Sequence, residues 1–138
     1  MSIYFCGAIN GGRQKQSEYK ELINHCKQYG KVWNENVGKK NIRIHKSCDI
    51  YSRNMNWIDQ AKVLIAEVSV PSLGVGMEIE HAIGMNPSIP ILCLFDMTQT
   101  KPTSRMITNC PNITLVGYAD IENAKKVITE FLKDKKLD

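Results

Sequence analysis

The sequence predicts an α/β fold, a single-domain, three-layer sandwich in which helices cover both faces of a five-stranded, mainly parallel sheet. Two observations support this prediction. Short apolar runs alternate with helix-like segments along the 138 residues, a pattern typical of βαβ units. The chain also has the length of one domain and contains no linker or internal repeat that would divide it. We therefore expect residues 1–138 to form one domain.

The predicted strands are the apolar runs within residues 2–9, 31–37, 62–69, 89–95 and 112–118. The first ends where Gly7 opens a glycine-rich turn, and the second is the weakest because polar residues interrupt it. The third, KVLIAEVS, is almost continuously apolar, which is typical of a parallel strand covered on both faces. Parallel strands joined by helices are the basis of Rossmann- and flavodoxin-like sheets, so we expect that architecture here.

Helices are predicted over residues 13–30, 50–61, 76–84 and 120–134. In the first, Tyr19, Leu22, Ile23 and Cys26 follow the i, i+3, i+4, i+7 spacing of one helix face. The last carries a similar apolar stripe, which we expect to face the core. The polar, basic segment 38–49 is expected to be a loop with short helical content.

Composition and charge exclude several classes of protein. The formal net charge is only +4 and aromatic residues are few, so we expect no nucleic-acid partner. No run of about 18 apolar residues exists and the N-terminus does not resemble a signal peptide, so no membrane association is expected. The five cysteines form no CxxC pair, which favours a reduced protein in the cytoplasm, with the nucleus as an alternative.

Ligands bind beyond the carboxyl ends of parallel strands, which here selects the loops 7–13 and 34–37 and the stretch after the third strand. The first loop, GAINGG, has neither GxGxxG nor Walker A spacing, so a classical dinucleotide or ATP site is not expected. Its glycines still allow a ligand to approach the backbone. In PSLGVGMEIE, Ser72 and the following amides precede a helix N-terminus, which favours an anion.

Glu78 follows this loop, and we expect it in the first turn of the helix, close to the strand ends. Such a carboxylate either complements the helix dipole or serves the ligand site. In a ligand crevice it can attack an anomeric carbon, as in retaining glycosyl transfer. The candidates to protonate the leaving group are Glu35, Asp49 and a residue of the helix before the third strand. The three histidines lack metal-ligand spacing, so we expect no metal and no cofactor.

Three segments carry a resemblance to a known family: IYFCGAINGGR (residues 3–13), AEVSVPSLGVGMEI (66–79) and ILCLF (91–95). Together they resemble the 2'-deoxynucleoside 5'-monophosphate N-hydrolases of the nucleoside 2-deoxyribosyltransferase superfamily, in matching order over nearly the whole chain. The PSLGVGxE motif is quite specific, and YFCGxIxGGR is specific in combination with it.

The resemblance implies a role for each matching residue. Glu78 matches the nucleophile that attacks C1' of the sugar, and Tyr4 matches a tyrosine that positions it. Ser104 matches a serine that reaches the phosphate from the other subunit, so a homodimer is implied. The other implied substrate-binding positions are Gly7, Ile9, Asn10, Gly12 and Arg13 around the first loop, and Ser72 and Gly74 in the phosphate loop.

Three positions depart from the family pattern. Asn54 stands where the family usually has an aspartate associated with protonation of the leaving base, and an asparagine has no titratable proton. Asn10 replaces an arginine and Asn36 replaces a histidine. For Asn54 the open explanations are an engineered trap for a ligand, Glu35 as the proton donor, a base that departs with little help, and a weak enzyme. The other two replacements favour natural divergence.

Three functions follow from these residues. The first is a hydrolase that cleaves nucleoside 5'-monophosphates to free base and (deoxy)ribose 5-phosphate through a covalent glycosyl–Glu78 intermediate. The second is a catalytically weakened nucleotide-binding protein, suggested by Asn54 and Asn10. The third is a transferase that exchanges bases. Ser72 favours the first over the third, because transferases of the superfamily tend to carry an acidic residue there, which would repel a phosphate.

Overall fold

In the computed structural model, which describes residues 1–9, 11–40 and 49–135, the strands form one parallel sheet. The strands are β1 (Ser2–Cys6), β2 (Lys31–Trp33), β3 (Val63–Glu67), β4 (Ile91–Asp96) and β5 (Thr114–Tyr118). They are ordered β2-β1-β3-β4-β5, and each neighbouring pair is parallel. The predicted α/β fold is confirmed, and within the described residues the sheet is parallel throughout rather than mainly so.

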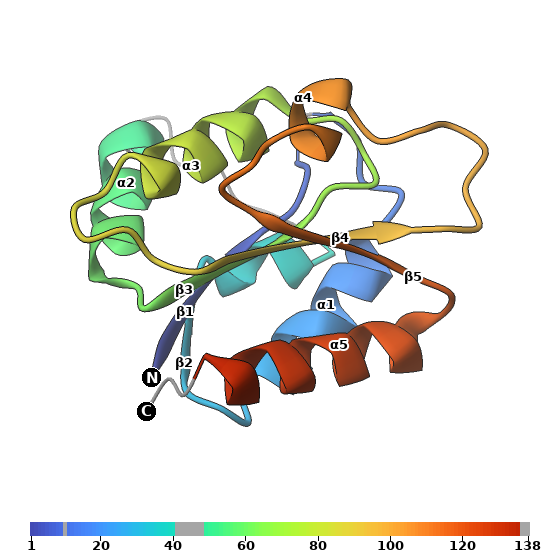
Figure 1. Cartoon of the computed structure of the whole chain (residues 1–138), viewed down its shortest axis with the longest axis horizontal. Helices are drawn as coiled ribbons and strands as arrows, with labels where there is room; N and C mark the ends of the chain where they lie inside the picture. The colour runs from blue at the N-terminus through green and yellow to red at the C-terminus, as the bar shows by residue number, and fades with distance from the viewer. Residues whose placement is uncertain (10, 41–48, 136–138) are drawn as a thin grey trace.

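Helices cover both faces of this sheet (Figure 1). Helices α1 (Gln16–Cys26) and α5 (Ile121–Asp134) pack side by side on one face, and α2 (Ile50–Gln60) and α3 (Leu73–Ile83) pack together on the other. The short elements η1 (Glu35–Gly38) and α4 (Arg105–Thr108) follow β2 and precede β5. No helix in the described ranges is both long and apolar enough to cross a membrane.

Each face of the sheet has its own hydrophobic core, because successive strand residues point to opposite sides. In β1, Ile3 and Phe5 belong to the core beneath α1 and α5, whereas Tyr4 and Cys6 belong to the core beneath α2 and α3. The strands are therefore buried on both faces, which explains why they read as nearly continuous apolar runs in the sequence.

Two boundaries differ from the sequence prediction near the ligand edge of the sheet. The second strand ends at Trp33, because Asn34 adopts a left-handed conformation (φ 68°) that turns the chain into η1. Helix α3 begins at Leu73 instead of Gly76, because Ser72 caps it with its hydroxyl accepting from the amide of Val75 at 3.3 Å. Of the predicted loop 38–49, residues 41–48 lie outside the described residues.

The order of the strands places a crevice at the carboxyl ends of β1 and β3. The chain leaves β1 toward α1 on one face and leaves β3 toward α3 on the other. Adjacent strands whose connections leave in opposite directions create the switch point at which open α/β sheets bind ligands.

Candidate active site

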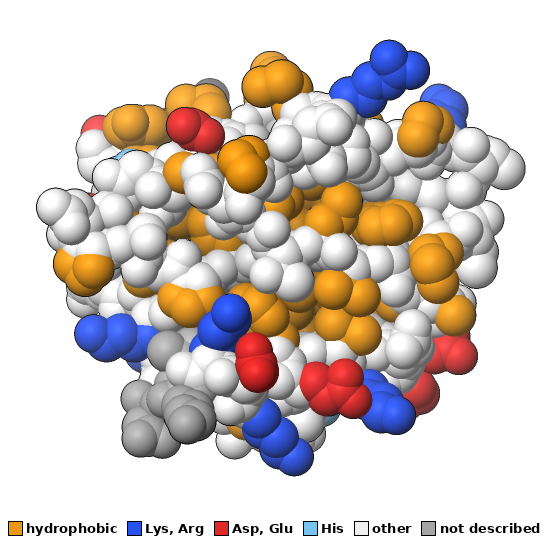
Figure 2. Space-filling view, in the orientation of Figure 1, with side chains coloured by type: hydrophobic (Ala, Val, Ile, Leu, Met, Phe, Trp, Pro, Cys, Tyr) orange, Lys and Arg blue, Asp and Glu red, His pale blue; other side chains and the backbone are white. Residues whose placement is uncertain are grey.

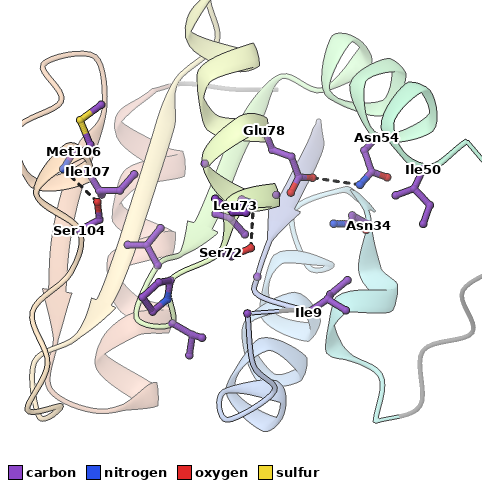
Figure 3. A pocket seen from close by; sticks show the side chains of 18 of the residues that line it. Ile9, Asn34, Ile50, Asn54, Ser72, Leu73, Glu78, Ser104, Met106 and Ile107 are labelled. Carbon is purple, nitrogen blue, oxygen red and sulfur yellow. Dashed lines mark hydrogen bonds between the residues drawn. The ribbon is translucent and has the colours of Figure 1, made fainter.

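A cavity of about 720 Å³ opens at this switch point (Figure 3). Its walls come from the segments after β1 and β2, from α2, from the turn between β3 and α3, from the first two turns of α3, and from α4. Among the described lining residues, Glu78 and Arg53 carry the charges. The rest are apolar groups, glycines, hydroxyls and amides, a composition typical of a site for a small organic ligand.

Glu78 lies in the second turn of α3, not in the first turn as predicted, because the helix begins earlier. A dipole-complementing role at the first turn is therefore excluded. The carboxyl group is buried, and its Oε2 accepts hydrogen bonds from the Tyr4 hydroxyl and, at 3.5 Å, from the Asn54 amide. Within the described residues both donors reach Oε2, so Oε1 is left for the cavity that Glu78 lines.

Burial of this carboxyl group raises the pKa of Glu78 to about 8. Removal from water disfavours the charged form of the carboxyl group, and this is the cause of the raised pKa. A carboxylate that ionises in such surroundings is poorly solvated and therefore more reactive toward an electrophilic carbon.

The amide of Asn54 has a defined orientation. Its Oδ1 accepts a hydrogen bond from Nε of Arg53 at 3.1 Å, so its NH₂ group is the part that faces Glu78. The Arg53 guanidinium in turn lies 4.5 Å from the centre of the Trp57 ring, which stacks on Trp33. Asn54 thus donates to Glu78 and has no titratable proton to give to a substrate.

The turn before α3, which the sequence predicts to bind an anion, forms part of the cavity wall. Ser72 and Gly74 both line the cavity, and the first amides of α3 have no acceptor within the helix. The first loop packs tightly against this turn, because a Cβ atom at Gly11 would collide with the carbonyl oxygen of Pro71. The two loops therefore form one continuous wall.

The structure brings most of the sequence-predicted site residues to this cavity. Its lining includes Gly7, Ile9, Asn54, Ser72, Gly74, Glu78 and Ser104, and the buried Tyr4 reaches Glu78 from β1. Ser104 lies across the cavity from Asn54, at the N-cap of α4 (Figure 3). Asn10 lies outside the described residues.

Gly12 and Arg13 are not among the described residues that line the cavity. The guanidinium of Arg13 donates to three backbone carbonyls, those of Ala8 at 3.1 Å, Val37 at 2.8 Å and Lys39 at 2.7 Å. Arg13 therefore connects the first loop to η1, and its contacts in this structure are architectural.

Neither acid considered as a proton donor belongs to the described lining. Glu35 is half exposed and forms an ion pair with Lys27 at 2.7 Å, because the turn at Asn34 directs it toward α1. Asp49 caps α2 by accepting from the amide of Ser52 at 3.0 Å. Within the described residues, Glu78 is thus the one acidic side chain of the cavity.

Sequence reasoning did not single out Arg53, Asn34 or Ile50, which also line the cavity. Arg53 and Ile50 lie on the same helix as Asn54. Because Asn54 was predicted to be a site residue, its neighbours on that helix could also have been considered. Asn34 directly follows β2, and its amide donates to the carbonyl of Phe5 at 3.0 Å.

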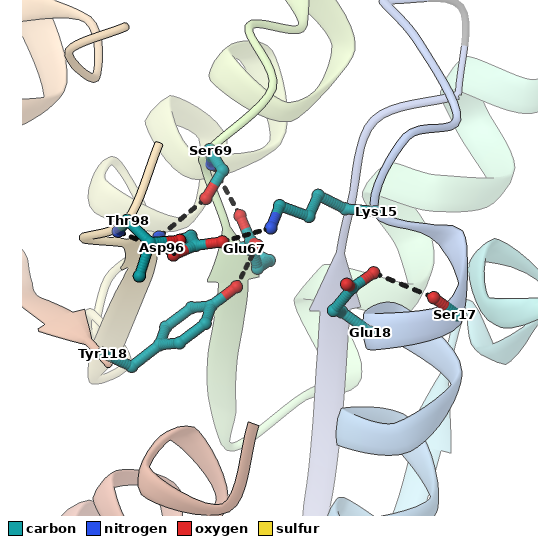
Figure 4. Close-up of polar contacts among 8 residues, drawn as sticks. All are labelled: Lys15, Ser17, Glu18, Glu67, Ser69, Asp96, Thr98 and Tyr118. Carbon is teal, nitrogen blue, oxygen red and sulfur yellow. Dashed lines mark hydrogen bonds and ion pairs between the residues drawn. The ribbon is translucent and has the colours of Figure 1, made fainter. Parts of the chain in front are cut away.

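A second buried carboxylate, Glu67, lies at the end of β3 (Figure 4). Its Oε1 accepts from the Ser69 amide at 2.5 Å and its Oε2 from the Tyr118 hydroxyl at 2.6 Å. The Ser69 hydroxyl accepts from the Asp96 amide at 2.8 Å, and Lys15 forms an ion pair with the Asp96 carboxylate. This network joins β3, β4, β5 and the segment before α1, beside the turn that precedes α3.

Fold and site together define an α/β protein with a buried carboxylate facing a ligand cavity at the switch point of a parallel sheet. Residues 3–128 match the family described as Nucleoside 2-deoxyribosyltransferase. The chain belongs to this family.

Curated relatives and a solved structure agree with that assignment. The 5-hydroxymethyl-dUMP N-hydrolase of Danio rerio is 41% identical over 140 residues, which cover 96% of each chain. The protein of the same name from Rattus norvegicus is 38% identical over 112 residues, covering 77% of this chain and 68% of the relative. The Clostridium botulinum CMP N-glycosidase BcmB shares the fold, with a TM-score of 0.65, 15% identity, and coverage of 94% of this chain and 99% of that one.

Proposed function

We propose that this protein hydrolyses the N-glycosidic bond of nucleoside 5'-monophosphates and releases free base and (deoxy)ribose 5-phosphate. Relatives at 38–41% identity are named as N-hydrolases of a nucleotide, and they align over most of the chain. The observation that carries the proposal is the single helix α3, which presents an anion-binding N-terminus and, one and a half turns later, a buried carboxylate facing the same cavity.

The spacing on α3 fits a phosphorylated sugar. Ser72 and Glu78 are six positions apart, so the helical rise separates them by about 9 Å along the axis. A 5'-phosphate hydrogen-bonded to Ser72 and the first amides of α3 would extend its pentose along the helix toward Glu78. In this arrangement binding of the phosphate positions C1' beside the reactive oxygen.

The proposed chemistry has two displacements at C1'. Oε1 of Glu78 forms a bond to C1' while the C1'–N bond breaks, and both electrons of that bond leave with the base. Water then displaces Glu78 from C1', its hydroxyl remaining on the sugar and one proton passing to the base. Tyr4 and Asn54 hold Oε2 through both steps, which keeps Oε1 directed at the sugar.

We also propose that the protein acts as a homodimer in which Ser104 contributes to the partner's phosphate site. Large apolar side chains are exposed beside the cavity, with Leu73 92%, Met106 84% and Met77 55% exposed. Figure 2 shows apolar side chains standing out along the edge of the molecule where α3 and α4 lie. Several exposed apolar side chains on one edge of a protein favour an association site there.

The free thiols of Cys6, Cys26, Cys93 and Cys110 support a reducing compartment, and we propose the cytoplasm. Burial raises the pKa of the Cys26 and Cys93 thiols to about 12, so these two are unreactive.

A panel of ribo- and deoxyribonucleoside monophosphates, assayed for free base, tests the proposed reaction. A hydrolase releases free base and sugar phosphate, whereas a transferase transfers the sugar to a labelled acceptor base. Tight nucleotide binding in calorimetry without release of base would instead favour the nucleotide-binding protein that Asn54 suggested. Sedimentation of the wild type, and rescue of Ser104→Ala by mixing with Glu78→Gln subunits, test the shared site.

A further inference from the structure

The cavity presents one cationic side chain among its described lining residues, and that side chain lies next to Asn54. Arg53 and Asn54 are consecutive residues of α2, and the Arg53 Nε donates to Asn54 Oδ1 at 3.1 Å. Asn54 donates onward to Glu78. A guanidinium group is thus connected to the reactive carboxylate through one side-chain amide, in the position where a proton donor would be expected.

An aromatic pair supports this guanidinium. Arg53 lies over Trp57 at 4.5 Å, and Trp57 stacks on Trp33 with ring centres 5.8 Å apart. A planar cation on an aromatic face is held in orientation as well as attracted. Arg53 is therefore a preorganised feature of the cavity wall.

The base of a bound nucleotide would lie on the side of the cavity that Arg53 occupies. With the phosphate at Ser72 and C1' at Glu78, α2 and the end of β2 form the wall on the side of Glu78 that faces away from α4. Figure 3 shows Asn34, Ile50 and Asn54 grouped on the far side of Glu78 from Ser104. Amides and a branched apolar side chain suit the edges and the face of a planar heterocycle.

We infer that Arg53 stabilises the departing base as an anion, in place of a general acid, an inference that rests on the proposed function. When the C1'–N bond breaks, the electron pair remains on the base, which is protonated only later by water. A guanidinium stays protonated at all working pH values, so it cannot act as an acid, but it can donate hydrogen bonds to the ring atoms that receive the charge. Preorganised donors of this kind contribute to rate only as charge develops.

The inference is tested by the dependence of kcat/KM on the acidity of the leaving base. Deoxynucleotides of uracil and 5-fluorouracil differ little in shape but carry leaving bases of different acidity. Arg53→Gln is expected to lower kcat/KM about 100-fold for the uracil nucleotide and clearly less, about 10-fold, for the 5-fluorouracil nucleotide. Arg53→Lys, which keeps the charge, should lie between wild type and Arg53→Gln in this ratio.

Lys31→Gln is the matched control. The Lys31 ammonium lies 3.6 Å from the centre of the Trp33 ring, so its loss removes a cation from the same aromatic pair, yet Lys31 does not belong to the described lining of the cavity. It should leave the ratio of the two substrates unchanged. An equal loss for both nucleotides in Arg53→Gln would overturn the inference and leave Arg53 a structural role. Failure of the wild type to release base from any nucleotide would instead overturn the proposed function itself.

Discussion

Two glutamates are buried near the carboxyl end of the sheet, and each accepts a hydrogen bond from a tyrosine hydroxyl. Glu78 is bound by Tyr4 and Glu67 by Tyr118. Burial raises the pKa of both carboxyl groups. The described donors differ between the two: those to Glu67 engage both of its oxygens, whereas those to Glu78 both reach Oε2, on a side chain that lines the cavity.

We propose that this difference separates a carboxylate with a structural role, Glu67, from one with a chemical role, Glu78. Glu67 accepts hydrogen bonds from the Ser69 amide and the Tyr118 hydroxyl, so the protein itself satisfies both oxygens of this carboxylate. Glu78 is desolvated without full compensation, and a partly satisfied buried group is destabilising unless a ligand completes it. Matched substitutions at the two positions should therefore have opposite consequences.

The largest expected effect is on catalysis. Glu78→Gln removes the proposed nucleophile but keeps the shape of the side chain, and we expect kcat to fall by about 10³-fold or more. Glu67→Gln is the matched control and should keep kcat within about threefold, because Glu67 touches no reacting atom. Base release from a nucleoside monophosphate measures both. Comparable losses in the two variants would contradict the distinction between the carboxylates.

The pH profile should report the ionisation of Glu78. Its folded-state pKa of about 8 means that most molecules carry a protonated, non-nucleophilic group at pH 6. We expect kcat/KM to rise about tenfold per pH unit up to about pH 8 and to level off above it. A steady-state profile from pH 5.5 to 9.5, with stability checked at each pH, measures this. A flat profile across pH 6–8 would contradict the raised pKa.

The two tyrosines offer a smaller and equally matched test. Tyr4→Phe removes the donor that holds Oε2, and we expect kcat to fall about 10- to 100-fold as the carboxylate loses its orientation. Tyr118→Phe removes the corresponding donor from Glu67 and should leave kcat nearly unchanged while lowering the free energy of unfolding by about 1–2 kcal/mol. Measurements of kcat and of the free energy of unfolding on both variants test this prediction, and an equal loss of kcat in the two would contradict it.

The last comparison concerns the free energy of unfolding, and the sign of the expected change differs between the two sites. Because the pKa of Glu78 is raised in the folded state, its contribution to stability is complete below the unfolded-state pKa near 4.5 and is lost as pH rises through about 8. Glu78→Gln should therefore be more stable than wild type at pH 8, by about 4 kcal/mol, and nearly equally stable at pH 4.5.

Glu67→Ala should instead be less stable at every pH, by about 3 kcal/mol, because it leaves two buried donors without an acceptor. Urea unfolding of both variants and wild type at pH 4.5 and pH 8 measures the sign of the change in the free energy of unfolding at each position. A Glu78→Gln variant that is destabilised at pH 8 would show that the carboxylate is structurally required.

The fold could be predicted well from the sequence because both faces of the sheet are covered. The run 62–69 reads as a strand for that reason, and β3 occupies its centre. The start of α3 could not be predicted from propensity, because Gly74 and Gly76 are poor helix formers and resemble a loop. The cap provided by Ser72 outweighs that preference, and it moves Glu78 from the first turn into the second.

The site residues that belong to a sequence motif could be predicted, whereas those brought to the cavity only by tertiary packing were missed. Ser72, Gly74 and Glu78 belong to one contiguous stretch, and all three line the cavity. Arg53 could be recognised as a lining residue only once the position of α2 over the end of the sheet was known. Glu67 gave a signal that was not used: a charged residue within a run expected to be buried on both faces must have its own partners.

The close packing of Gly11 against the Pro71 carbonyl has a consequence for the way the cavity opens. The Arg13 side chain donates to the backbone carbonyls of Val37 and Lys39 from the same loop. The loop after β1 therefore contacts both the turn before α3 and the η1 segment. Segments coupled in this way exchange their amide hydrogens as one cooperative unit. Ligand exchange in this protein is therefore expected to require the whole edge to loosen together, since neither loop can swing away while its neighbour stays in place.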